Sequence, residues 1–251
     1  MKSVDVQLIR NATMKIKYNG KTILIDPMFS SKNTFMSFIE PNKNLNPILN
    51  LPIDIQDIIE DVDTILITHL HPDHLDPLAV KSLNVALPMF VQPTDISAVK
   101  AMGFVNVKAV DDAIEYDGIE IIKTYGHHGP KEIRSHLGEV SGYILSAQDY
   151  PTIYIIGDCI WENIIQETIK KHSPDIIITN SGGAVFMGEH RILMDANETI
   201  LVAEMAPKAQ VIATHMEALD HCLSTREALK QKADASKVNI LIPQDGEWLS
   251  L

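Results

Sequence analysis

The sequence predicts an α+β fold in which two β-sheets pack face to face and helices cover the outside. Each half of the chain begins with short apolar strand patterns and then changes to alternating helix and strand patterns. An apolar content of 45% is ordinary for a globular protein. Because no repeat, low-complexity tract or linker divides the 251 residues, we expect one domain over residues 1–251.

The first half opens with predicted strands at residues 4–10, 13–18 and 22–25, and Asn19-Gly20 is a strong hairpin signal between the last two. Residues 29–52 follow as a long stretch rich in Asn and Pro. This stretch either packs its apolar residues onto the core or forms the rim of an active site, and the sequence leaves both possibilities open. Beyond it we expect helices at 53–61, 77–83 and 94–102, the last with Thr94 as N-cap and Gly103 after its end, and strands at 64–67, 86–91 and 105–110.

The second half repeats this order of elements. Asp117-Gly118 is a second hairpin signal. We expect strands at 113–116, 119–124, 140–146, 152–156, 176–179, 211–214 and 240–242, and helices at 161–171, 197–205 and 225–232, the last capped by Ser224 or Thr225.

Composition narrows the class of protein. There are 21 basic and 33 acidic residues, a formal net charge of −12, and no Lys- or Arg-rich patch. Because binding to a phosphate backbone relies on clustered positive charge, no nucleic-acid partner is expected. No apolar run approaches the roughly 18 residues of a membrane span, and Asp5 lies where a signal peptide would have its apolar core. With only two cysteines, Cys159 and Cys222, the chain is expected to be cytoplasmic and without a disulfide framework, and its oligomeric state is open.

The most informative stretch runs from Thr68 to Asp76, with the sequence THLHPDHLD. Directly after a buried-strand pattern it holds His69, His71, Asp73 and His74. Residues two apart in an extended segment point the same way, so His69 and His71 can bind one ion. The chain turns at Pro72, so Asp73 and His74 can face a second ion. Imidazoles and carboxylates suit zinc, manganese and iron, and the stretch therefore predicts a metal site.

This His-x-His-x-Asp-His spacing resembles the signature of the metallo-β-lactamase superfamily. Further motifs in the same order extend the resemblance over nearly the whole chain. The chain is similar to bacterial members of the branch that includes ascorbate-phosphate lactonases and phospholipase D-type enzymes. The resemblance implies a four-layer αββα sandwich with the metal ligands at strand ends on one edge.

The resemblance also implies the remaining ligands. The third histidine of the first site falls at His127-His128-Gly129, where His128 is preferred because it directly precedes the glycine. Asp158, after Gly157, would bridge the two ions, since two dications about 3.5–4 Å apart repel and a shared carboxylate offsets this. His215, at another strand end, would complete the second site. The expected sites are therefore His69, His71, His128 and Asp158 for one ion, and Asp73, His74, His215 and Asp158 for the other.

Three nearby residues have weaker assignments. Asp26 matches an aspartate that orients ligands through hydrogen bonds, although a plain Asp-Pro turn remains open. His127 would be a supporting or solvent-exposed histidine. His221 is either a structural residue or a contact to the substrate. Cys222 is expected to be a small buried residue, and a glycine-rich loop at 180–184 is expected near the pocket. His136 and His172 are expected on the surface, and Glu189, His190 and Arg191 are expected on a solvated face, with contact to the substrate as the alternative.

The implied activity is metal-dependent hydrolysis of a small ester, lactone or phosphoester by water held between two divalent ions. Zn²⁺ is the expected ion, with Mn²⁺ or Fe²⁺ as alternatives. Asp73 is the candidate catalytic residue that orients the water and accepts its proton. A phosphodiesterase or nuclease of the same fold, and a non-catalytic metal-binding protein, are the alternative functions.

Overall fold

The computed structural model describes residues 1–40 and 42–251, and its core is two facing sheets of seven strands each. The first sheet has the order β18 (Trp248–Ser250), β1 (Asp5–Arg10), β2 (Thr13–Tyr18), β3 (Lys21–Ile25), β6 (Thr64–Leu66), β7 (Met89–Val91) and β8 (Val107–Ala109). The second has the order β17 (Ile240–Leu241), β16 (Gln210–Thr214), β13 (Ile176–Asn180), β12 (Ile153–Ile155), β11 (Ser141–Ser146), β10 (Ile119–Tyr125) and β9 (Ala113–Tyr116).

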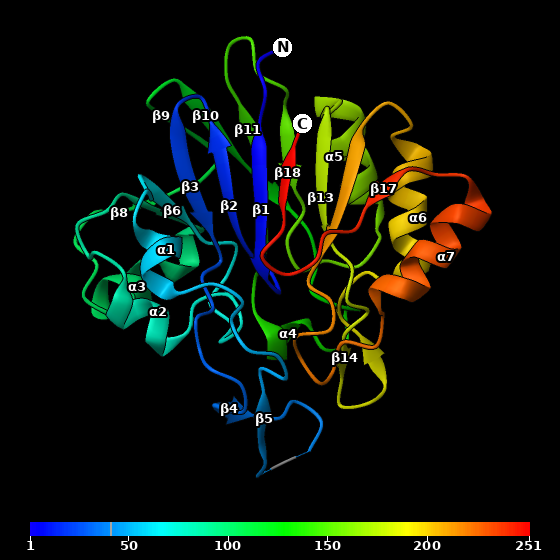
Figure 1. Ribbon diagram of the computed structural model, residues 1–251, viewed down its shortest axis with the longest axis horizontal. Coiled ribbons are helices and arrows are strands. Elements are labelled where there is room, and N and C mark those ends of the chain that lie inside the picture. Colours follow the sequence, from blue (N-terminus) through cyan, green and yellow to red (C-terminus); the bar gives the residue numbers. More distant parts are fainter. Residues whose placement is uncertain (41) are drawn as a thin grey trace.

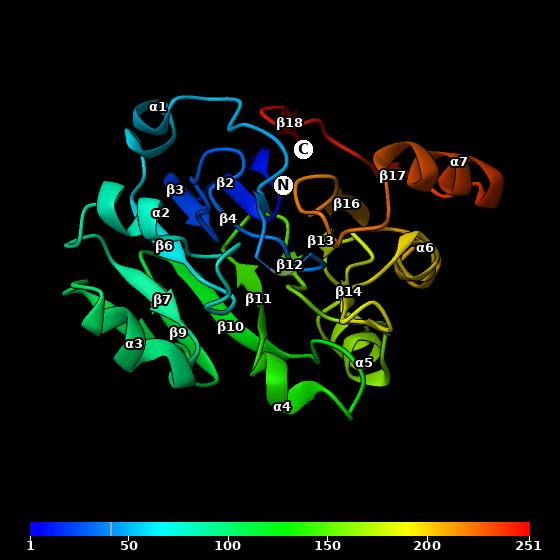
Figure 2. The same ribbon diagram turned by 90° about the horizontal axis from the view of Figure 1, so that it is seen from below.

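Helices cover the outer face of each sheet (Figures 1 and 2). The first sheet is covered by α1 (Ile55–Ile59), α2 (Pro77–Ser82) and α3 (Ile96–Ala101), and the second by α5 (Asn163–His172), α6 (Ala196–Met205) and α7 (Arg226–Ser236). The predicted four-layer αββα sandwich is confirmed.

The strands that carry the fold are buried on both faces because their side chains alternate between two apolar layers. In β3, Ile23 and Ile25 pack between the sheets, whereas Leu24 packs against the helices. In β13, Ile178 lies between the sheets and Ile177 faces the helices. This is why these strands read as continuous apolar runs in the sequence.

The two predicted hairpin turns are present. Asn19 and Gly20 have φ angles of 49° and 74°, and Asp117 and Gly118 have φ angles of 47° and 77°. Two positive φ angles in a row are what a tight two-residue hairpin needs, and glycine adopts them without strain.

One cap prediction was wrong. Thr94 does not cap a helix, because Pro93 begins a 3-10 turn, η1 (Pro93–Asp95), that contains it. The N-cap of α3 is Asp95, and its side chain makes no capping hydrogen bond. Thr225, one of the two expected caps of the last helix, does accept a hydrogen bond from the Ala228 amide.

Short elements escaped prediction because two to four residues carry no periodicity. They are β18, α4 (Arg134–Leu137), the β14–β15 pair (Val185–Phe186 and His190–Arg191) and the β4–β5 pair (Phe35–Met36 and Asn44–Asn46). The β4–β5 hairpin, α4 and β14 gather at the lower edge of Figure 1, opposite the two ends of the chain.

Residues of the long stretch at 29–52 both pack onto the core and reach a cavity. Phe29 is buried in the core, whereas Phe38 lines a cavity at the lower edge. The buried guanidinium of Arg10 fixes the base of the stretch: Nη2 donates to the carbonyls of Met28 (3.1 Å) and Ser30 (2.8 Å), and Nη1 to that of Leu49 (2.9 Å).

We expect Ile178→Ala to lower the free energy of unfolding by about 2–5 kcal/mol, because it removes a fully buried side chain from between the sheets. Ile39→Ala is the matched control, since Ile39 is 47% exposed, and should change stability by less than about 0.5 kcal/mol. Urea unfolding followed by circular dichroism measures both. Equal losses in the two variants would contradict this description of the core.

Candidate metal centre

Strand ends from both sheets bring the predicted ligands together at one edge. His69 follows β6, His128 follows β10, Asp158 follows β12 and His215 follows β16. The side chains form two groups in which the potential ligand atoms lie within 4.8 Å of one another. One group is His69, His71 and His128, and the other is Asp73, His74, Asp158 and His215.

In the first group, the hydrogen bonds of the rings decide which nitrogen is free. Nε2 of His71 lies 2.9 Å from the Leu137 carbonyl, and Nδ1 of His128 lies 2.7 Å from the Ile192 carbonyl. A carbonyl only accepts, so these nitrogens carry the protons and the opposite nitrogens keep their lone pairs. Nδ1 of His71 is 3.0 Å from Nε2 of His69. Burial lowers the pKa of His128 to about 4, so the ring is neutral, as a metal ligand must be.

In the second group, one carboxylate oxygen faces imidazoles of both groups. Oδ2 of Asp158 lies 3.2 Å from Nε2 of His74, 3.5 Å from Nε2 of His215 and 3.7 Å from Nε2 of His128. Oδ2 of Asp73 lies 3.1 Å from Nε2 of His215. Asp158 is thus placed as a ligand shared between two ions would be.

The electrostatics of this group suit a dication. Burial opposes ionisation of Asp158, but His215 and His74 outweigh it and hold the pKa of the carboxyl well below its ordinary value. Burial also opposes charge on His74, yet Asp158, Asp73 and Asp26 raise the pKa of this ring to about 10. The buried carboxylates are therefore stable only when positive charge lies among them. A divalent cation would supply that charge in place of the ring protons. The donor set fits divalent metals with nitrogen and oxygen ligands.

Asp26 connects both groups, so it is more than a turn residue. Oδ2 lies 2.8 Å from Nδ1 of His74 and accepts a hydrogen bond from the Thr68 hydroxyl at 2.7 Å. That hydroxyl is 3.1 Å from Nδ1 of His69. Both rings are thereby oriented with Nε2 toward the other ligands.

Two asparagines complete the support and were missed by sequence reasoning. Asn180 donates to Oδ1 of Asp158 at 2.6 Å and accepts from the Thr214 hydroxyl at 2.9 Å. Nδ2 of Asn11 lies 3.2 Å from Nε2 of His215. The available signal was position, because Asn11 directly follows β1 and Asn180 is the last residue of β13.

The glycine-rich loop at 180–184 has a steric role at the site. His215 has a left-handed φ of 59°. A Cβ added at Gly182 would lie 2.1 Å from the His215 carbonyl oxygen, so only glycine allows this approach.

The side chains of the adjacent residues His127 and His128 point in different directions. Nδ1 of His127 pairs with Glu162, which also accepts a hydrogen bond from Arg134. His127 therefore stays outside the two groups, while His128 is 3% exposed and lies inside one.

The ligands open into a cavity of about 220 Å³. Its lining is Phe38, His71, Pro72, Asp73, His128, His136, Leu137, Asp158, Val185, Phe186, Ile192 and His221. His136 is exposed, as expected, but it belongs to this lining, which the sequence did not indicate. Cys222 does more than fill space beside the site, because its Sγ lies 3.7 Å from Nδ1 of the candidate ligand His215.

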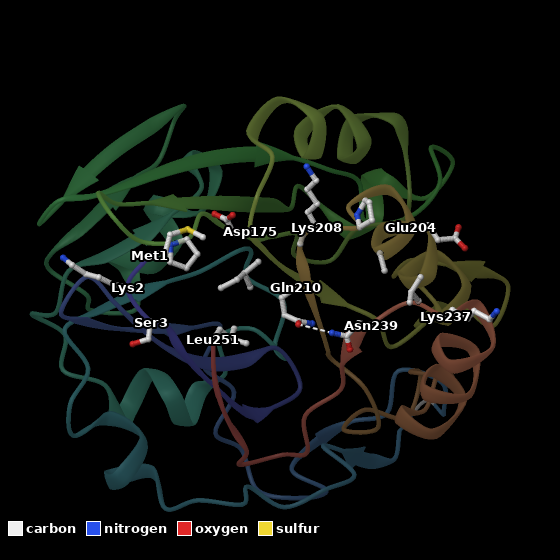
Figure 3. Close-up of a pocket in the computed structure, with 16 residues that line it drawn as sticks. Met1, Lys2, Ser3, Asp175, Glu204, Lys208, Gln210, Lys237, Asn239 and Leu251 are labelled. Carbon is white, nitrogen blue, oxygen red and sulfur yellow. Dashed lines mark hydrogen bonds between the residues drawn. The ribbon is translucent and has the colours of Figure 1, made fainter.

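A larger cavity of about 830 Å³ lies at the other end of the sheets (Figure 3). Its lining mixes Lys2, Lys208 and Lys237 with Asp175 and Glu204. Its described lining contains no histidine and neither ligand group, so we assign the site to the smaller cavity.

The chain matches the sequence profile of the beta-lactamase superfamily domain over residues 21–216 and belongs to that family. UPF0173 protein YddR of Bacillus subtilis is 37% identical over 250 residues, which cover 97% of this chain and 98% of the relative. UPF0173 metal-dependent hydrolase PH1671 of Pyrococcus horikoshii is 24% identical and covers 99% of this chain and 100% of its own.

Solved structures agree with this family. An isothiocyanate hydrolase from Delia radicum gut bacteria is 33% identical, with a TM-score of 0.91 and 98% of each chain covered. A possible metal-dependent hydrolase from Veillonella parvula is 31% identical, with a TM-score of 0.94 and coverage of 98% of this chain and 99% of its own. The protein is a metal-dependent hydrolase with the metallo-β-lactamase fold.

None of the helices in residues 1–40 and 42–251 combines the length and apolar character needed to cross a membrane.

We expect His128→Ala to remove most bound metal from the first group, because it deletes one of three imidazoles. His127→Ala is the matched control and should retain the metal, since its ring pairs with Glu162 instead. Metal content per chain, measured by mass spectrometry after gel filtration, tests this. Loss of metal in the His127 variant alone would reverse the assignment.

Proposed function

We propose that the protein hydrolyses a small, neutral and largely apolar electrophile, namely an ester, a lactone or an isothiocyanate, with water held between two divalent cations. One observation supports this most strongly: the two groups of candidate ligands open into a small cavity whose remaining wall is mostly apolar. Zn²⁺ is the proposed ion, and the same donor set would accept Mn²⁺ or Fe²⁺.

The cavity limits the size of the substrate. Its volume of about 220 Å³ is below the roughly 300–1,000 Å³ of pockets for drug-sized ligands. Its apolar wall comes from Phe38, Pro72, Leu137, Val185, Phe186 and Ile192. A compact substrate with an apolar substituent fits this space.

The charge of the lining argues against a phosphoester, a phosphodiesterase or a nuclease. Among the described residues that line the cavity there is neither a lysine nor an arginine. Phosphate groups are usually held by such cations, often through paired hydrogen bonds. The net charge of −12 adds repulsion for a polyanion. A neutral substrate is therefore favoured.

Isothiocyanates are among the proposed substrates because the isothiocyanate hydrolase described above is 33% identical to this chain. Water adds to the central carbon of R–N=C=S, and one of its protons moves to nitrogen. The second proton follows as the C–N bond breaks, which gives R–NH₂ and COS. Esters and lactones undergo the same kind of addition at a carbonyl carbon. In each case the leaving atom must receive a proton.

Bound dications would lower the pKa of water and stabilise negative charge that develops on the substrate. The side chains of the protein do the rest. Asp73, which lines the cavity, orients the attacking water and accepts its proton. Asp158 holds the two sites together, while Asp26 and Asn180 keep the ligands in place. A non-catalytic metal-binding protein would have no need of an apolar cavity at its ligands.

We expect chelation to abolish hydrolysis and added Zn²⁺ or Mn²⁺ to restore it. Asp158→Asn should lower metal affinity by more than the ~10–100-fold typical of residues that only support ligands, because it removes a charge shared by both sites. Asp73→Asn should lower kcat by about 10²–10⁴-fold through loss of the proton acceptor.

Turnover of δ-valerolactone, phenyl acetate, phenethyl isothiocyanate and bis-p-nitrophenyl phosphate, together with metal content, measures these effects. Asp234→Asn on the exposed face of α7 is the control and should behave as wild type. Activity that survives both chelation and Asp158→Asn would show that any metal is structural. Preference for the phosphodiester would refute the neutral substrate.

A further inference from the structure

His221 has an unusual environment for a polar side chain. It is 7% exposed and lines the cavity, and its Nδ1 has no hydrogen-bond partner among the described residues. Buried polar atoms are nearly always hydrogen-bonded, so an exception at an active site calls for a functional explanation.

The ring is held firmly in place. The His221 ring packs against the Phe38 ring in a T-shaped arrangement, with a centroid distance of 4.6 Å and an interplanar angle of 74°. The His221 carbonyl accepts a hydrogen bond from the Val185 amide at 3.1 Å. Next to it, Asp220 exchanges hydrogen bonds with Asn46, from Nδ2 at 2.9 Å and to Oδ1 at 3.0 Å. The β4–β5 hairpin thus fixes the segment that carries His221.

The geometry also decides which nitrogen faces the cavity. Nδ1 is buried without a partner, whereas Nε2 is not among the buried atoms that lack one, so Nε2 is the ring nitrogen left to face the cavity. Placing the proton on Nε2 leaves only an acceptor unsatisfied at Nδ1, and orphaned buried acceptors are tolerated better than orphaned donors. Burial lowers the pKa of His221 to about 4, so the ring is neutral near pH 7.

We infer that His221 contacts the substrate and donates a hydrogen bond from Nε2–H to the leaving atom, the ester or lactone oxygen or the isothiocyanate nitrogen. This inference rests on the proposed function and deepens it. Negative charge grows on that atom as its bond to carbon breaks. A neutral, fixed donor stabilises this charge more in the transition state than in the bound substrate. The substrate must therefore carry a hydrogen-bond acceptor directly attached to the attacked carbon.

The first experiment compares His221→Phe, His221→Asn and His172→Phe in the zinc-loaded protein. Phenylalanine keeps the ring contact with Phe38 and removes the donor, whereas asparagine restores a donor. His221→Phe should lower kcat by roughly 10–100-fold with little change in KM, and His221→Asn should recover part of the loss. His172→Phe, at the C-terminal end of α5 and outside the lining of this cavity, should stay near wild type. All variants should keep their metal. A wild-type kcat in His221→Phe, or loss of metal from it, would overturn the inference.

The second experiment needs no turnover. Titration of ¹⁵N-histidine-labelled, zinc-loaded protein with tetrahydropyran, a cyclic ether that keeps the ring oxygen of δ-valerolactone and cannot be hydrolysed, should shift the Nε2 resonance of His221 and leave that of His172 in place. The assignment comes from the His221→Phe spectrum. Binding that leaves the His221 resonance unmoved, or no binding at all, would overturn the inference. Inactivity of the wild type on every substrate would instead refute the proposed function, and the titration would still decide the role of His221.

Discussion

The structure depends on the repulsion among charges that are buried together at one edge of the sandwich. Asp73 and Asp158 are almost fully buried, and two carboxylates in a low-dielectric interior are stable only when positive charge lies between them. Histidines from both sheets provide it without metal, and the two divalent cations of the proposed function would provide it in their place. Asp158 has a central position among these charges, because one of its oxygens faces the imidazoles and the other accepts a hydrogen bond from Asn180.

This constraint explains why the fold is built as two facing sheets. Strands that pack into the apolar layer between the sheets are held rigidly, and strand ends supply His69, His128, Asp158 and His215 at one edge. Rigid placement matters because metal sites tolerate little error in ligand position. The apolar layer between the sheets, which includes Ile178, is therefore also the support of the site.

Sequence reasoning found the strands and the histidine and aspartate ligand candidates because both carry strong local signals: continuous apolar runs, and ionisable residues at their ends. It missed Asn11 and Asn180, since an asparagine after a strand looks like a turn residue until its partners are known. It misplaced the cap at Thr94 because the effect of Pro93 on the following turn outweighed the propensity of threonine. The wall of the cavity could not be predicted, because β4, β14 and α4 are too short to show periodicity.

Different elements of the fold carry the chemistry of the site and the shape of the substrate cavity. The candidate ligands lie on strand ends that the core fixes, whereas Phe38, Leu137, Val185 and Phe186 lie on short hairpins and on α4 at the edge. Substitutions in these short elements change the shape of the cavity without touching the buried carboxylates. His221 belongs to both parts, since it follows the His215 strand end and yet packs on Phe38. A change in the β4–β5 hairpin therefore alters the position of a donor at the reacting centre as well as the width of the cavity.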